Sequence, residues 1–117
     1  MAFKEKISEL TASESIISPD CIFTGNLITK GSIKIEGIVN GSISEAKEVF
    51  VSKTAKITGD ISSEKCIVYG AIKGNILSRN FVEIMSTASI IGDITTQKIM
   101  VEEGAGINGM VRVKNQI

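Results

Sequence analysis

Few side chains in this chain of 117 residues have the chemistry that catalysis or metal binding requires. The chain has no histidine, which excludes a Ser-His-Asp triad, a Cys-His pair and histidine metal ligands. The two cysteines, Cys21 and Cys66, stand far apart in the sequence. We expect two reduced, packed thiols, with a disulfide or redox pair as the alternative. No residue is therefore assigned to catalysis, to a cofactor or to a metal.

Two Gly-Asp pairs, Gly59-Asp60 and Gly92-Asp93, are the next candidates because carboxylates bind calcium. Calcium-binding nonapeptides repeat Gly-Gly-x-Gly-x-Asp, which this sequence lacks, so corner aspartates are expected instead. No Gly-Lys-Ser/Thr motif follows a strand, so no nucleotide site is expected. Thirteen basic and thirteen acidic residues cancel. The absence of a basic stripe argues against nucleic acid as a partner, and zero net charge permits self-association.

The pattern apolar-x-Gly-x-apolar occurs six times, and this repeat organises the chain. Its glycines recur at a nearly constant interval, although the interval varies slightly from one unit to the next: Gly25, Gly41, Gly59, Gly74, Gly92 and Gly109. An alternating apolar triplet, such as Ile33-Lys34-Ile35, lies between successive glycines. Alternation with a period of two residues predicts short strands. Five of the six residues after the glycines are small and polar, which is typical of a corner.

A unit of about 17 residues with three two-faced strands cannot bury its inward side chains alone. Coiling the chain stacks equivalent strands about 4.8 Å apart around a shared aliphatic interior. We therefore predict an all-β, single-domain parallel β-helix, a solenoid of about six windings with three short strands per winding. The predicted domain spans residues 16–113, after a flexible N-terminal tail at 1–15 and before a short tail at 114–117. Solenoid acyltransferases and carbonic anhydrases rely on histidines, and solenoid lyases need long loops, so no enzyme is expected.

The two tips of such a rod expose unpaired strand edges and the apolar interior in cross-section. The simplest inference is that other copies of the chain cover them. The predicted end-to-end polymerisation interface consists of Ile16, Ile17, Ile22, Phe23, Ile107, Met110, Val111 and Val113. In the alternative, the N-terminal tail folds back over the first winding and assembly stops at a dimer.

The middle residue of each triplet is expected to point outward. Phe50 and Ile67 would then be neighbours on the surface, and Met100 would extend their apolar character. These three residues are a candidate lateral contact, with ordinary surface apolarity as the alternative.

The repeated Ile/Val-x-Gly-Asp/Asn-Ile units, the segment from Gly31 to Ile43 and the late segment from Glu103 to Gly109 resemble the bactofilins. These are polymer-forming bacterial cytoskeletal proteins, and the resemblance covers residues 16–113. It implies a right-handed β-helix and filaments that form end to end, without nucleotide and without polarity. It also implies a scaffold for cell shape that recruits cell-wall-modifying enzymes. The family often carries an aromatic residue in its final winding, where this chain has Ile107.

Many bactofilins also carry a short N-terminal membrane-binding segment. The match here is Met1, Phe3 and Ile7, flanked by Lys4 and Lys6, which suits the bilayer interface, although Glu5 and Glu9 oppose it. The sequence contains no signal peptide and no membrane span, so a cytoplasmic protein is expected, with the inner face of the membrane as a candidate location. The function expected is a cytoskeletal scaffold subunit that supports cell shape or localises cell-envelope proteins. The alternative is a capped monomeric or dimeric module that binds a protein partner.

Overall fold

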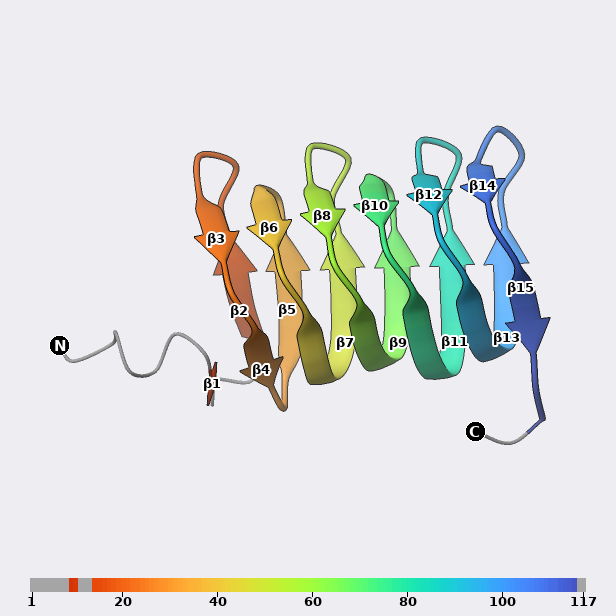
Figure 1. Cartoon of the computed structure of the whole chain (residues 1–117), viewed down its shortest axis with the longest axis horizontal. Helices are drawn as coiled ribbons and strands as arrows, with labels where there is room; N and C mark the ends of the chain where they lie inside the picture. Colours follow the sequence, from red (N-terminus) through yellow and green to blue (C-terminus); the bar gives the residue numbers. More distant parts are fainter. Residues whose placement is uncertain (1–8, 11–13, 116–117) are drawn as a thin grey trace, which may run out of the picture.

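The computed structural model describes residues 9–10 and 14–115, and over these residues every regular element is a strand. This part of the chain has no helix that could cross a membrane. In Figure 1 the nearer strands run down the page and the fainter, more distant strands run up, while the chain advances to the right. That combination is a right-handed coil. The predicted right-handed parallel solenoid of about six windings is therefore confirmed.

The windings form two sheets in which all strand pairs are parallel. The six-stranded sheet has one three-residue strand per winding: β3 (Ile22–Thr24), β6 (Ile38–Asn40), β8 (Lys56–Thr58), β10 (Ala71–Lys73), β12 (Ser89–Ile91) and β14 (Gly106–Asn108). The nine-stranded sheet contains the remaining strands: β1 (Glu9–Leu10), β2 (Glu14–Ile17), β4 (Leu27–Thr29), β5 (Ser32–Ile35), β7 (Ile43–Val51), β9 (Ile61–Val68), β11 (Ile76–Ile84), β13 (Ile94–Val101) and β15 (Val111–Val113).

In four windings, two of the three predicted short strands join into one long strand that bends around a corner. The strands β7 and β11 have nine residues, and β9 and β13 have eight. The register of β7 with β9 shifts between Ile43 and Ala46, where Glu45 has a φ of 62°. An extra residue of this kind lets a strand turn without losing its partner strands. In the first winding the two parts stay separate, as β4 and β5.

The core consists of columns of equivalent residues from successive windings. One column runs through Leu27, Ile43, Ile61, Ile76 and Ile94, and each of these side chains is at most 2% exposed. Burial of this kind contributes roughly 1.5–3 kcal/mol for each aliphatic side chain. Because each member packs between the windings on either side, only the members at the two tips lack a neighbour.

Two kinds of corner precede the strands of the six-stranded sheet. Tall corners at residues 18–21, 52–55, 85–88 and 102–105 lead into β3, β8, β12 and β14, whereas tight corners at 36–37 and 69–70 lead into β6 and β10 (Figure 1). Each tall corner closes with a turn, as where the Ala55 N–H donates to the Ser52 carbonyl at 2.9 Å. A Cβ at Gly70 of the tight corner would collide with the carbonyl oxygens of Ser52 and Ala55.

The uneven spacing of the glycines follows from two variables, which are the length of the long strand and the type of corner in each winding. A long strand of nine rather than eight residues adds one residue to the winding, and a tall corner adds two. The interval from Gly59 to Gly74 combines the shorter strand with a tight corner and is the shortest in the chain. The two longest intervals, which end at Gly59 and Gly92, combine the longer strand with a tall corner.

Strand pairing extends into the segment that was expected to be a tail. The strand β2 pairs with β5, and β1 pairs with β4, so the structure places Glu9, Leu10 and Glu14 in parallel pairing. An open solenoid edge offers unpaired backbone groups, and these short strands use them.

Candidate assembly surfaces

The six corner glycines stack in one column at the turn into the nine-stranded sheet. All six have positive φ values, from 129° at Gly25 to 153° at Gly109. A Cβ at Gly59 would collide with the carbonyl group of Gly41 directly beneath it. The column therefore lets successive windings approach closely, which is a structural task rather than ligand binding.

The residues after these glycines form a hydrogen-bond ladder. The backbone N–H of Asn75 donates to Asp60 Oδ1 at 3.0 Å, and the N–H of Asp93 donates to Asn75 Oδ1 at 3.0 Å. The N–H of Met110 then donates to Asp93 Oδ1 at 3.1 Å. Asp60 and Asp93 thus serve the backbone of the next winding. Met110 has no side-chain oxygen, so it ends the ladder at the C-terminal tip.

A row of buried hydroxyl groups, which the sequence patterns did not predict, runs along the bend of the nine-stranded sheet. Its members are Thr29, Ser63, Ser78 and Thr96, all at most 3% exposed. Ser63 Oγ lies 3.0 Å from Ser78 Oγ and donates to the Lys65 carbonyl at 2.9 Å. The signal was available, because each of these residues stands two positions after a buried Leu or Ile.

The C-terminal tip exposes the ends of the interior columns. Val111 stacks on Ile94, and Val113 stacks on Thr96, yet Val111 and Val113 are 41% and 56% exposed. Ile107 stacks on Ile90 and is half-buried. Met110, at the neighbouring corner, is 53% exposed. All four residues predicted for this end of the polymerisation interface therefore lie together on the tip.

Two further residues belong to the same tip and were not predicted. Ile99 and Val101 stack on Val82 and Ile84, but β15 covers only the first part of β13. Ile99 is therefore half-buried, and Val101 is 48% exposed. The sequence could have indicated both residues, because they are the two inward positions of the last apolar triplet.

The N-terminal tip is more closed. Ile17 is 7% exposed and Leu27 is 2% exposed, although both lie at the N-terminal end of their inward columns. Of the four residues predicted for this end, Ile17 and Phe23 point inward, and Phe23 is half-buried. Ile16 and Ile22 point outward from the sides of the rod and are 61% and 66% exposed.

The outward residues of the triplets form one continuous column on the side of the rod. The register places Ile16, Lys34, Phe50, Ile67, Glu83 and Met100 side by side, one from each strand. A second column beside it contains Ser32, Glu48, Lys65, Phe81 and Lys98. We call these two columns the lateral face. The candidate lateral residues Phe50, Ile67 and Met100 all lie on it.

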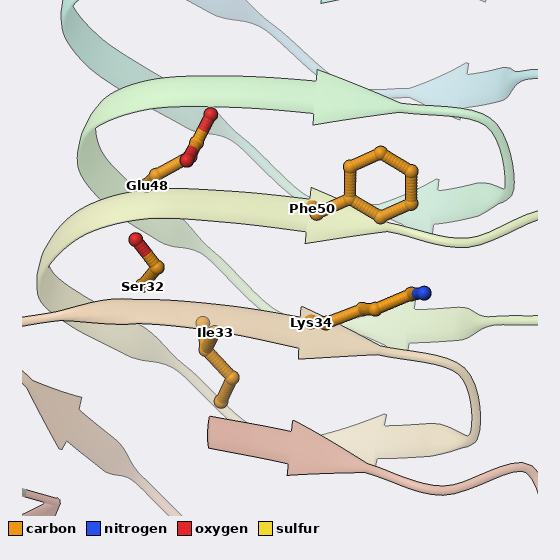
Figure 2. Close-up of a pocket in the computed structure, with 5 residues that line it drawn as sticks. All are labelled: Ser32, Ile33, Lys34, Glu48 and Phe50. Carbon is orange, nitrogen blue, oxygen red and sulfur yellow. The ribbon is translucent and has the colours of Figure 1, made fainter. Parts of the chain in front are cut away.

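Two open hollows mark the lateral face. Figure 2 shows Lys34 and Phe50 projecting on the same side from successive strands, beside a hollow of about 170 Å³ that Ser32 and Glu48 also line. The Lys34 ammonium lies 5.6 Å from the Phe50 ring centroid and 3.7 Å from Glu36 Oε2. The second hollow, of about 320 Å³, lies near Glu83 and Met100. The face therefore combines apolar and charged groups within the same column.

The two cysteines are both free, as expected, but the expectation that both are packed is wrong for Cys21. Cys21 is exposed in a tall corner, whereas Cys66 is fully buried in the core. Burial raises the pKa of the Cys66 thiol to about 12, so this group stays protonated and unreactive at neutral pH. The candidate membrane residues Met1, Phe3, Lys4, Lys6 and Ile7 lie outside the described residues.

Comparison with protein families places this chain. The model of the family described as Bactofilin, polymer-forming cytoskeletal, matches residues 15–112. Comparison with curated proteins and with solved structures gives no match. The match covers most of the chain, including all six glycine corners. The chain therefore belongs to the bactofilin family of polymer-forming cytoskeletal proteins.

Proposed function

We propose that the protein is a filament subunit that self-assembles end to end, without nucleotide, through the tips of its solenoid. The observation that carries this proposal is the apolar C-terminal tip, where Val101, Val111 and Val113 are 41–56% exposed although each continues an inward column. In the middle of the rod the same positions are occupied by residues that are nearly fully buried. A second copy on the tip would bury these side chains in the same way.

Backbone pairing supports the same arrangement. The strands β14 and β15 end the two sheets, and within residues 14–115 no further strand pairs with their outer edges. An open edge with apolar side chains beside it favours pairing with another chain. The contact needs no bound nucleotide because its driving force is apolar burial and strand pairing.

Replacement of Val111 by arginine tests the end contact. The guanidinium group would bring a charge into the apolar joint, so the variant should form no filaments. Negative-stain microscopy and a pelleting assay, each performed without ATP or GTP, measure this. Far-ultraviolet circular dichroism should keep its β signal, since Val111 lies at the rim of the fold. Ile91→Arg is the matched control, because Ile91 is 48% exposed on the side of the rod and its change should leave filaments intact. Filaments that persist with Val111→Arg would refute the proposed joint.

The wider role follows from the family and from the candidate membrane segment. We propose that filaments act as a scaffold that supports cell shape or localises cell-envelope proteins, including cell-wall-modifying enzymes. Residues 1–7 would hold them at the inner face of the membrane. Deleting residues 2–7 keeps β1 and should abolish sedimentation with anionic liposomes. If the deletion leaves liposome binding unchanged, or if the full chain does not bind liposomes, the proposed membrane contact is wrong.

The second candidate is a capped module that binds a protein partner. The buried Ile17 and Leu27 favour it, since they show that one tip is already largely covered by the chain itself. A single low-mass species in sedimentation over a wide range of salt would support this module and would count against the filament.

A further inference from the structure

We propose that the lateral face is a second self-association surface, on which two copies pair side by side with their solenoid axes antiparallel. This contact is distinct from the end contact and does not depend on it. Its occupant is another copy of the same chain, and the argument rests on the order of apolar and charged residues along the column.

The central column of the lateral face is self-complementary when read in opposite directions. From the N-terminal winding onward its residues are apolar, positive, apolar, apolar, negative, apolar: Ile16, Lys34, Phe50, Ile67, Glu83 and Met100. A two-fold axis along the strand direction, between the windings of Phe50 and Ile67, pairs each residue with its complement. Lys34 then faces Glu83, Phe50 faces Ile67, and Ile16 faces Met100 of the other copy. Such an interface is isologous, as two-fold dimers require.

The second column fits the same axis. Glu48 and Lys65 lie on the two windings beside the axis, so Glu48 of one copy faces Lys65 of the other. The exposed Ile16 also comes opposite the hollow near Glu83 and Met100. Charge complementarity and the fit of an exposed apolar side chain to a hollow therefore agree on one register.

Other registers lose this complementarity. If the two solenoids ran parallel, Lys34 would face Lys34 and Glu83 would face Glu83, and contacts between like charges are strongly unfavourable. An antiparallel shift by one winding would place Lys34 opposite either Ile67 or Met100, so the other copy would offer the ammonium no counter-charge and only Glu36 of its own chain would remain. The sequence of the column thus selects one arrangement and disfavours its neighbours.

The lateral face is small, which predicts a weak contact in isolation. Six strands about 4.8 Å apart span roughly 24 Å, and the two columns lie roughly 7 Å apart. The buried area is then below that of standard stable complexes. Where copies are already joined into a rod, the contacts repeat along its length and act together.

Cysteine cross-linking in the full chain tests the register directly. The Cys21→Ser background removes the exposed thiol, and Lys34→Cys is combined with Glu83→Cys. Within one chain these positions lie three windings apart, roughly 14 Å, which is beyond the reach of a disulfide, so any bond joins two copies. Oxidation should give a dimer on non-reducing gels. Lys34→Cys alone should give none, because it faces Glu83. A dimer from the single variant, or no dimer from the double variant, would overturn the proposal.

Charge exchange provides the second test. Lys34→Glu or Glu83→Lys alone should reduce side-by-side pairing of filaments on the order of tenfold, and the double exchange should restore it. Lys73→Glu, on the six-stranded sheet, is the matched control and should have no effect. The cross-linking is repeated with Val111→Arg, in which end-to-end assembly is blocked. A cross-linked dimer of the Val111→Arg variant shows that the lateral contact forms without the end joint. If the double charge exchange does not restore pairing, the lateral contact is refuted, and the end joint is not affected.

Discussion

Replacing Gly59 by alanine should destabilise the fold more than the same change at Gly25, although the two glycines occupy equivalent corners of different windings. Both have positive φ values, 144° at Gly59 and 129° at Gly25. A Cβ at Gly59 would collide with the backbone of Gly41, whereas a Cβ at Gly25 would meet only a Phe23 ring atom at 4.0 Å. The pair therefore separates the cost of the backbone conformation from the cost of forcing two windings apart.

The magnitude follows from these two terms. Holding alanine at such a φ costs about 1–3 kcal/mol at either position. At Gly59 the displaced winding also weakens the flanking hydrogen bonds, from Gly41 N–H to the Thr58 carbonyl at 2.8 Å and from Ile43 N–H to the Asp60 carbonyl at 2.9 Å. Each such bond contributes about 0.5–1.5 kcal/mol. Gly59→Ala should thus lower the free energy of unfolding by about 1–3 kcal/mol more than Gly25→Ala.

Urea unfolding followed by circular dichroism measures this difference. Both variants also carry Val111→Arg, so that assembly does not contribute to the free energy. Equal losses at the two positions would mean that the windings do not press against each other at the glycine column. A larger loss at Gly25 would refute the stacking argument altogether.

Further predictions concern the core. A thiol reagent should modify one cysteine per native chain, Cys21, and the second, Cys66, only after unfolding. Because the pKa of Cys66 rises from 9.0 to about 12 in the fold, the unfolded chain loses this proton first, and stability should fall as pH rises from 9 towards 12. Cys66→Val should flatten that fall in pH-dependent urea unfolding. Ser78→Ala should lower the free energy of unfolding by only about 0.5–1.5 kcal/mol. Ser63 keeps its bond to the Lys65 carbonyl, and the row of buried hydroxyl groups already contains an alanine, Ala46. A loss above about 3 kcal/mol in urea unfolding would contradict this expectation.

The repeat alone was sufficient to predict the solenoid, because each glycine motif fixes a corner and each triplet fixes which side chains point inward. Ile33 and Ile35 are buried and Lys34 between them is half-exposed, as the alternation requires. The prediction of three separate strands was only partly right. The backbone continues through the bend near Glu45, and periodicity of side chains does not reveal whether the backbone breaks there.

The tips and the polar interior were harder to predict. Ile16 was assigned to the end of the rod, but its register with Lys34 places it on the lateral face. Thr29 and Thr96 are harder to predict because hydroxyl residues at a bend resemble surface residues, and only their spacing of two from Leu27 and Ile94 indicates that they point inward. The pairing of β1 depends on the open edge of β4, which no local pattern in the sequence encodes.

Tall and tight corners alternate from residue 18 to residue 88, and this has a consequence for how long such a rod can be made. The Thr54 hydroxyl donates to the carbonyl of Glu36, and Thr87 donates in the same way to Tyr69, so the tall corners at 52–55 and 85–88 are each fastened to the tight corner before them. The sequence separation between the two threonines equals that between Gly37 and Gly70 of the tight corners. The true module of the rod is thus a double winding. A duplicated copy of residues 37–69 inserted before Gly70 would carry both corners and both strand lengths with it, and would lengthen the subunit by roughly 10 Å while keeping every neighbour in phase.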